Sequence, residues 1–220
     1  SKTDSDRKKT IIELEELLKL EMDELTQGKI YNCLGGFYTN LKRNVENLNK
    51  ALEYHKRAKA IREKSSTNIM DLARTYNNIA NVYFYKSKIE NEKEGNLKNA
   101  EKYYIKSMDL RKKVLNNNHP DIARVLVNLG NVYVEQSKYK DALSVMEKSL
   151  KIREKFLGSC SVEVGVTYAN MARAYEKLQD KENVLKCVKK AKEIFLLLYG
   201  EKSDKYINLC KNYENVISDM

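Results

Sequence analysis

The sequence predicts an all-α protein, a right-handed α-solenoid of antiparallel helix pairs. The first reason is composition, because one proline and eight glycines in 220 residues are few for a β-rich or turn-rich fold. The second is a repeat, since the stretch at 131–158 returns 42 residues later at 173–200. Both copies space their apolar residues as one face of a helix does. A single helix pair cannot bury that face alone, so we expect neighbouring pairs to stack into a continuous core.

The repeat extends over most of the chain. Tyr133 recurs as Tyr175, and the motif at 77–83 matches the one at 127–133, with a longer following loop in the earlier copy. A weaker copy precedes them, and a partial copy follows at the end of the sequence. The expected organisation is an acidic tail and amphipathic capping helix at 1–26, four repeats within 27–200 (27–64, 70–116, 120–158 and 162–200), and a capping helix or partial fifth repeat at 201–220.

Each copy alternates large and small residues in a way that suits close helix packing. In the third copy, Leu129 and Tyr133 lie one turn apart on the first helix, and Gly130 stands beside them. The second helix carries Ala142 and Ser149 on its apolar face. Small side chains let two helices approach closely, and the large ones fill the space beside them. We therefore expect these positions to form the interface within each helix pair.

This pattern resembles the tetratricopeptide repeat, whose motif is matched here by Leu126, Leu129, Gly130, Tyr133, Ala142, Met146 and Ser149. The 42-residue period and the exit sequence at 151–158 are similar to the longer kinesin light chain variety of that repeat. Ser137 stands where the family usually has glycine. The resemblance covers about 27–217 and implies a concave surface lined by the first helix of each pair. It also implies a cytoplasmic adaptor or scaffold, with cytoskeletal association as one option.

Two interpretations remain open for the acidic segment before the repeats. Residues 10–25 have Ile11, Leu14 and Leu18 at helical spacing and predict one amphipathic helix. This helix either caps the first repeat or lies in the groove as an acidic pseudo-ligand. Kinesin light chains are similar in having an acidic segment that inhibits them. An intramolecular contact between this helix and the groove is therefore one expected partner interaction.

The charge distribution favours anionic partners. The net charge is +10, but residues 1–25 hold eight acidic against five basic side chains, so the remaining chain carries +13. A basic body attracts acidic protein segments, nucleic acid and anionic lipid alike. The lysines and arginines alternate with acidic residues instead of forming one dense block. Binding to nucleic acid or anionic lipid is thus kept as an alternative, and neither is the expected main partner.

The sequence gives little support to catalysis. There are only two histidines, of which His55 falls at a packing position and His119 precedes a helix. No phosphate-binding glycine loop or metalloprotease motif is present. The four cysteines form no Cys-x-x-Cys pair, so we expect free thiols in a reducing compartment such as the cytoplasm. We expect no enzyme activity, no cofactor, no metal and no small-molecule substrate.

The predicted ligand-binding groove follows the other face of each first helix. Asparagine amides can match the C=O and N–H groups of an extended peptide, and cations can bind carboxylates. The ligand would be an extended acidic or acid-flanked segment of another protein. The asparagines could instead brace adjacent helices, and a partial carboxylate clamp leaves chaperone C-termini as a further alternative. The predicted groove residues are Lys29, Asn32, Arg74, Asn77, Asn78, Asn81, Phe84, Arg124, Asn128, Asn131, Asn170 and Arg173.

Overall fold

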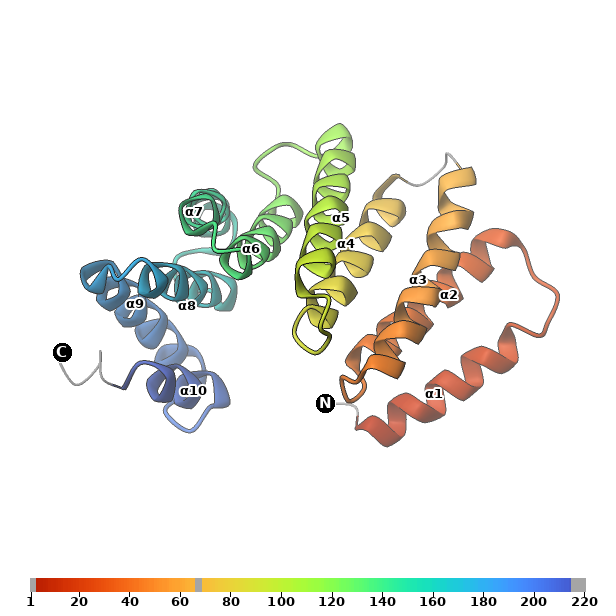
Figure 1. Ribbon diagram of the computed structural model, residues 1–220, viewed down its shortest axis with the longest axis horizontal. Helices are drawn as coiled ribbons and strands as arrows, with labels where there is room; N and C mark the ends of the chain where they lie inside the picture. Colours follow the sequence, from red (N-terminus) through yellow and green to blue (C-terminus); the bar gives the residue numbers. More distant parts are fainter. Residues whose placement is uncertain (1–2, 66–68, 215–220) are drawn as a thin grey trace. The chain divides into compact units, whose positions relative to one another are not determined.

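The computed structural model describes residues 3–65 and 69–214, and these residues form ten α-helices and no strand (Figure 1). The all-α prediction is thereby confirmed. The chain divides into two compact units, Ser1–Leu115 and Asn116–Met220, and each is described by itself. Unit 1 contains α1 (Asp4–Leu17), α2 (Glu24–Asn40), α3 (Val45–Lys64), α4 (Ile69–Lys86) and α5 (Lys93–Val114). Unit 2 contains α6 (Pro120–Glu135), α7 (Tyr139–Leu157), α8 (Val162–Lys177), α9 (Lys181–Tyr199) and α10 (Asp204–Asn212).

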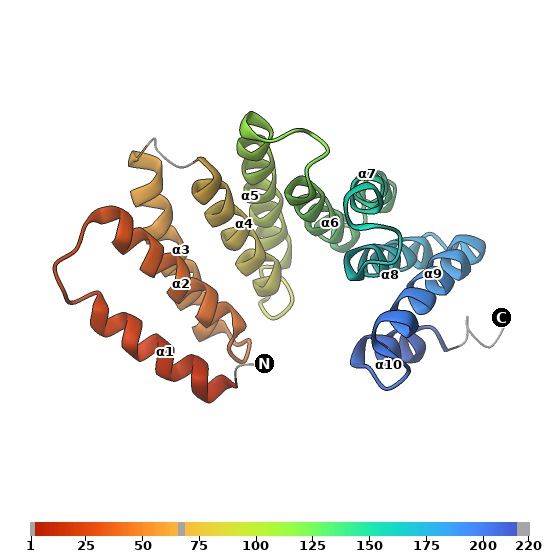
Figure 2. The same ribbon diagram turned by 180° about the vertical axis from the view of Figure 1, so that it is seen from behind.

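Each unit consists of stacked helix pairs. In unit 1, α2 packs on α3 and α4 on α5, and α3 also contacts α4 (Figures 1 and 2). In unit 2, α6 packs on α7 and α8 on α9, α7 contacts α8, and α10 rests against α9. The first helices of successive pairs also touch, α2 with α4 and α6 with α8. The first helices therefore share one side of each unit, as the solenoid prediction requires.

Local sequence explains where the helices begin. The Asp23 carboxylate accepts a hydrogen bond from the Thr26 N–H at 2.9 Å, and Asn44 caps α3 in the same way. His119 caps α6 through Nδ1, which accepts from the Asp121 N–H at 3.1 Å, and Pro120 occupies the first helical position. Side-chain acceptors satisfy N–H groups that have no partner within the helix, and proline suits a position that needs no N–H.

The single helix predicted over 10–25 is wrong. Helix α1 begins earlier, at Asp4, behind a capping box in which Thr3 and Asp6 bond each other's backbone N–H. It ends at Leu17, and Leu25 belongs to the next helix, which starts after Asp23. The apolar periodicity continues across this break. The helix is interrupted because Asp23 caps the start of α2, where its carboxylate accepts from the Thr26 N–H.

Helix α1 covers the end of the first helix pair (Figure 2). Ile11 is buried among the residues of the α2–α3 core. The Glu15 carboxylate accepts hydrogen bonds from the hydroxyls of Tyr38, at 3.1 Å, and Tyr54, at 2.8 Å. Burial and the bond to Glu15 raise the pKa of Tyr38 to about 12. None of these contacts involves a predicted groove residue, so they favour the capping interpretation of the acidic segment.

Small residues mark the closest approach within each helix pair. A Cβ atom built on Gly35 would lie 2.6 Å from the imidazole of His55, which is buried at 1% exposure. The Ser149 hydroxyl donates to the Ala123 carbonyl at 2.7 Å, linking α7 to α6. Ser107 donates to Ala73 at the same distance between α5 and α4. The small positions thus supply close approach and also hydrogen bonds across the pair.

Gly35 and its neighbour Gly36 should respond to alanine in opposite directions. Gly35→Ala drives a methyl group into the His55 ring, and overpacking of this kind costs about 1–3 kcal/mol. Gly36→Ala meets nothing within 4 Å and removes the helix-propensity cost of glycine, a gain of about 0.5–1 kcal/mol. Urea unfolding followed by circular dichroism measures both. Equal effects of the two substitutions would contradict this account of the α2–α3 interface.

An arginine, half-buried in unit 1 and buried in unit 2, ties one described helix pair to the next within each unit. Arg62 of α3 donates to the Asp71 carbonyl at 3.1 Å and to the Thr75 hydroxyl, both on α4. Arg153 of α7 donates to the Glu163 carbonyl at 2.7 Å and to the Thr167 hydroxyl at 2.8 Å, both on α8. Charge-assisted hydrogen bonds of this kind are stronger than neutral ones. Stacking therefore depends on a polar link as well as on apolar burial.

Candidate functional site

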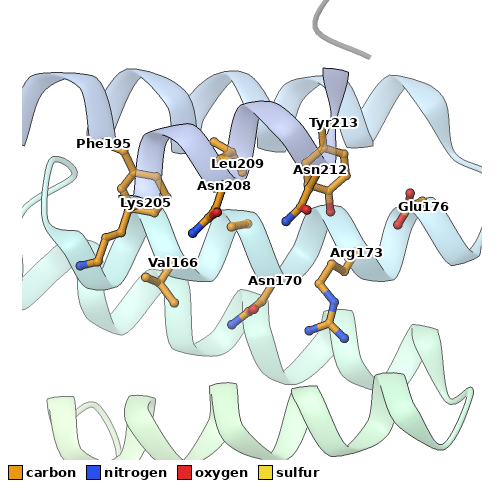
Figure 3. A pocket seen from close by; sticks show the side chains of 11 residues that line it. Val166, Asn170, Arg173, Glu176, Phe195, Lys205, Asn208, Leu209, Asn212 and Tyr213 are labelled. Atoms are coloured by element: carbon orange, nitrogen blue, oxygen red, sulfur yellow. The ribbon is translucent and has the colours of Figure 1, made fainter. Parts of the chain in front are cut away.

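Unit 2 contains a pocket of about 540 Å³ between α8 and α10, closed on one side by Phe195 of α9 (Figure 3). Its floor is apolar and its walls carry amides and charges. Since ligand pockets typically combine an apolar lining with a few polar groups, this is the candidate site. The lining residues are Val166, Ala169, Asn170, Arg173, Glu176, Phe195, Lys205, Asn208, Leu209, Asn212 and Tyr213.

Helical spacing places these side chains. On α8, Val166, Asn170 and Arg173 follow one another at intervals of one turn, so they share a face. On α10, Lys205, Asn208 and Asn212 do the same. Figure 3 shows the two faces turned toward each other, with Asn208 and Asn212 directed at α8. The Ser203 hydroxyl fixes the start of α10 by accepting from the N–H of the third helical residue, at 3.3 Å.

The pocket has unlike ends. Lys205 lies at one end and Glu176 at the other, with the asparagines between them (Figure 3). The Lys205 ammonium donates to the Tyr199 hydroxyl at 3.1 Å and lies 4.6 Å from the centroid of that ring. Arg173 forms an ion pair with Glu135 of α6, with 3.1 Å between Nη2 and Oε1. Its charge is therefore already shared with a carboxylate of the protein.

The pKa of Tyr213 is affected by the charged residues Glu176 and Arg173 of the pocket. Its side chain is buried, and burial raises the pKa of its hydroxyl to about 12, with Glu176 adding to the shift and Arg173 opposing it. The phenol is thus neutral at physiological pH and remains a hydrogen-bond donor as well as an acceptor. Asn212 is the last residue of α10 and Tyr213 follows it directly, and both line the pocket.

The asparagines of unit 2 keep their amides available. Within the described residues, the side chains of Asn128, Asn170, Asn208 and Asn212 have no hydrogen-bond partner in the protein. The Oδ1 atom of Asn131 is buried and also has no partner among the described residues. A buried amide oxygen without a donor is costly, but this one is covered by the protein and does not line the pocket. The other four amides can bind a ligand without breaking an internal bond.

Two predicted asparagine positions on α4 in unit 1 are engaged internally. Asn78 donates to Asn32 at 3.2 Å and so links α4 to α2. Asn81 accepts from the Tyr104 hydroxyl at 2.6 Å. Asn77 is buried at 7% exposure, and its Oδ1 has no hydrogen-bond partner among the described residues. At Asn78 and Asn81 the bracing alternative describes the observed contacts. Asn131, which follows Asn81 by one long repeat, lacks such a bond because the tyrosine is replaced by methionine in its pair.

The predicted cations are distributed between the two units. Arg74 of unit 1 is exposed and forms an ion pair with Asp71 at 2.7 Å. Arg124 of unit 2 is exposed and pairs with Asp121 at 2.9 Å. Lys29 is exposed on α2, and Phe84 on α4 is half-buried with the Lys88 ammonium 5.2 Å from its ring centroid. Of the twelve predicted groove residues, Asn170 and Arg173 line the pocket, and the shared groove stays a prediction.

Sequence reasoning missed the contribution of α10. Lys205, Asn208, Asn212 and Tyr213 all line the pocket, yet that segment was expected to be a capping helix or a partial fifth repeat, with no groove residue in it. The available signal was the 42-residue spacing, because Asn212 follows Asn170 by one further period.

Other kinds of site find little support in the described residues. Residues 3–65 and 69–214 hold no group of three or more His, Cys, Asp or Glu side chains that could bind a metal ion. The four cysteines are free thiols. None of the described helices combines the length and the apolar character that a membrane span requires. The absence of catalysis stays a prediction.

Family comparison identifies the repeats. A sequence model described as tetratricopeptide repeat matches residues 89–155, and a second model with the same description matches residues 166–195. The chain contains tetratricopeptide repeats. The second match covers most of α8 and α9, so the α8 side of the pocket, with Asn170 and Arg173, lies within a recognised tetratricopeptide repeat.

Solved structures with tetratricopeptide-like folds confirm the predicted α-solenoid. The chain superposes on BtubC (BKLC) from P. vanneervenii with a TM-score of 0.73, at 16% identity, covering 98% of this chain and 83% of that one. It superposes on a putative kinesin light chain from Podosopora anserina, described as having nearly identical TPR-like repeats, with a TM-score of 0.69 at 15% identity and 90% coverage of both chains. The predicted likeness to kinesin light chain repeats is therefore confirmed at the level of fold.

A third solved structure and the curated relatives complete the comparison. A Rap protein complexed with Competence and Sporulation Factor gives a TM-score of 0.69 at 14% identity, covering 93% of this chain and 55% of that one. Clustered mitochondria protein homologs are 29% identical over 106 residues in Aspergillus niger and 26% identical over 173 residues in Candida albicans. These matches cover 48% and 79% of this chain, but only 8% and 12% of the relatives' lengths.

Proposed function

We propose that this chain is a non-catalytic protein-interaction module, an adaptor or scaffold that binds an extended acidic or acid-flanked segment of a partner protein. The observation that carries the proposal is the α8–α10 pocket, where Asn170, Asn208 and Asn212 present amides with no partner among the described residues. The tetratricopeptide fold supports the general role of protein binding.

The chemistry of the pocket suits a peptide backbone. Each asparagine offers two donors and an acceptor, which match the carbonyl and N–H groups of an extended chain. Val166, Leu209 and Phe195 supply an apolar floor for a ligand side chain. A volume of about 540 Å³ lies within the usual range for ligand sites and is large enough for a few residues. A short stretch of a partner, rather than a folded domain, would therefore enter it.

Charge favours an acid-bearing ligand. The chain outside residues 1–25 carries +13, which raises the encounter rate with anionic partners. Lys205 has no ion-pair partner among the described residues and keeps two N–H donors beyond its bond to Tyr199. An acidic side chain of the ligand would bind there.

The comparisons support binding in general and leave the partner open. One neighbour of the same fold, a Rap protein, has been solved in complex with Competence and Sporulation Factor. The curated relatives are many times longer than the matched segment, so the role of the whole relative does not transfer. We further propose a cytoplasmic location, which four free thiols support.

The test begins with selection of peptides from a random twelve-residue display library on the immobilised chain. The selected peptides are then titrated against the wild type and the Asn170→Ala/Asn212→Ala double variant by fluorescence anisotropy. Loss of two amide hydrogen bonds, each of about 0.5–1.5 kcal/mol, should weaken binding about tenfold or more. Asn91→Ala/Asn117→Ala, two exposed loop positions outside the pocket, is the matched control. Failure to enrich any peptide, or equal affinity of both double variants, would refute the proposal.

A further inference from the structure

The two ends of the α8–α10 pocket differ in sign of charge, and the difference is built from several groups. Glu176 lies one turn beyond Arg173 on α8, at the end of the pocket away from Lys205 (Figure 3). The Arg173 guanidinium is bound to Glu135 at 3.1 Å. The cation at this end is thus paired within the protein, whereas Glu176 has no ion-pair partner among the described residues. The carboxylate that a ligand meets at this end is that of Glu176.

The opposite end carries an uncompensated positive charge. The Lys205 ammonium contacts the hydroxyl and the ring of Tyr199, both of which are neutral. Neither contact removes its charge, and together they hold the flexible side chain at the pocket end. A carboxylate of a ligand would therefore find a positioned cation at this end.

Amides occupy the space between the two charges. Asn170, Asn208 and Asn212 lie between Lys205 and Glu176 in Figure 3, and within the described residues their amides have no internal partner. Amides bind a peptide backbone regardless of its side chains. The middle of the pocket thus accepts many sequences, and the two charged ends supply the selectivity.

We propose that the pocket selects an extended segment with opposite charges at its two ends, an acidic side chain at Lys205 and a basic side chain at Glu176. This inference rests on the proposed function and narrows it, because a uniformly acidic segment would be repelled by Glu176. A given ligand would lie with its acidic end toward Lys205, since the opposite placement would bring like charges together.

The length of the pocket along α8 sets the approximate spacing of the ligand charges. In Figure 3 Val166 lies at the Lys205 end of the pocket, and it is ten positions from Glu176 along α8, which corresponds to about 15 Å at 1.5 Å per residue. An extended peptide advances about 3.3 Å per residue. The acidic and basic side chains of the ligand should therefore be separated by about four or five residues.

The test uses four fluorescein-labelled peptides of equal length, titrated at low salt by fluorescence anisotropy. The first carries a pair of aspartates and a pair of lysines at the two ends of a Gly-Ser spacer. The second is acidic at both ends, the third is basic at both ends, and the fourth is uncharged. The wild type should bind the first, mixed-charge peptide about tenfold more tightly than each of the others, in whichever chain direction it lies. Lys205→Glu should shift the preference to the basic peptide, and Glu176→Lys should shift it to the acidic peptide.

A neutral double variant, Lys205→Met/Glu176→Gln, guards against structural effects of the single substitutions and should lose the preference for the mixed-charge peptide. Circular dichroism must show that each variant keeps its helicity. Equal binding of the mixed-charge and uncharged peptides to the wild type, or tighter binding of the acidic peptide, overturns the inference. If the mixed-charge peptide does not bind while a library-selected peptide still binds and depends on Asn170 and Asn212, the inference fails and the proposed function stands. If no peptide of any kind binds, both fail.

Discussion

Arg153→Ala should destabilise the protein by about 3 kcal/mol, one of the largest effects expected for a single substitution outside the apolar core. Arg153 is buried, and its guanidinium donates to the Glu163 carbonyl and to the Thr167 hydroxyl on the next helix pair. Hydrogen bonds to charged groups contribute about 1.5–3 kcal/mol each. The substitution removes two of them and also the packing of the aliphatic stem.

Urea unfolding followed by far-UV circular dichroism measures this effect. Lys151→Ala, at an exposed position of the same helix, should change stability by less than about 0.5 kcal/mol. Arg153→Met keeps most of the volume and should recover part of the loss. In a double-mutant cycle with Thr167→Val, a coupling energy near zero would mean that the link between α7 and α8 does not stabilise the stack.

Acid should destabilise the protein through His55. Burial, with the nearby Arg62 adding to it, lowers the pKa of His55 to about 3, whereas an unfolded histidine titrates near 6.5. Below about pH 6.5 the unfolded chain binds a proton that the folded chain does not, so stability is lost as pH falls. The loss amounts to about 2 kcal/mol at pH 5 and levels off only below the folded pKa.

His55→Met isolates this contribution from that of the carboxylates. Methionine is the residue that the third repeat carries at the same position, where Met146 packs against Gly130 as His55 packs against Gly35. The unfolding free energy of both proteins is measured between pH 4 and pH 8. The difference between them should change by about 1.4 kcal/mol per pH unit below pH 6.5. A pH-independent difference would show that His55 is not held neutral in the folded protein.

Most of the fold could be predicted from the sequence, because each repeat places its buried residues at the same helical spacing. The spacing of Leu129, Gly130 and Tyr133 is enough to identify the buried face of α6. The start of α2 could not be read in the same way, since apolar periodicity runs through Asp23 and only the cap interrupts it. The links made by Arg62 and Arg153 were also missed. Both residues belong to helices rich in charged residues, and the sequence does not indicate that their guanidinium groups bind carbonyls of the next helix pair.

The candidate site was predictable only in part. Asn170 and Arg173 were found from their phase on the first helix of a repeat. The different bonding of Asn81 and Asn131 could not be predicted, because it depends on the residue that faces each of them from the second helix of the pair. Tyr104 engages Asn81, whereas Met146 has no hydroxyl to give Asn131. An alignment of the repeats shows asparagine at both positions and does not reveal that only one of them has a hydrogen-bond partner in the second helix.

The central claim is that the inner face of α8 and α10 binds an extended segment of a partner protein. Its most direct test is the ratio of affinities of the wild type and the Asn170→Ala/Asn212→Ala variant for one library-selected peptide. The account predicts a ratio of about ten or more, with unchanged helicity and unchanged affinity in the Asn91→Ala/Asn117→Ala control. A ratio near one would place the binding surface elsewhere on the chain and contradict the account.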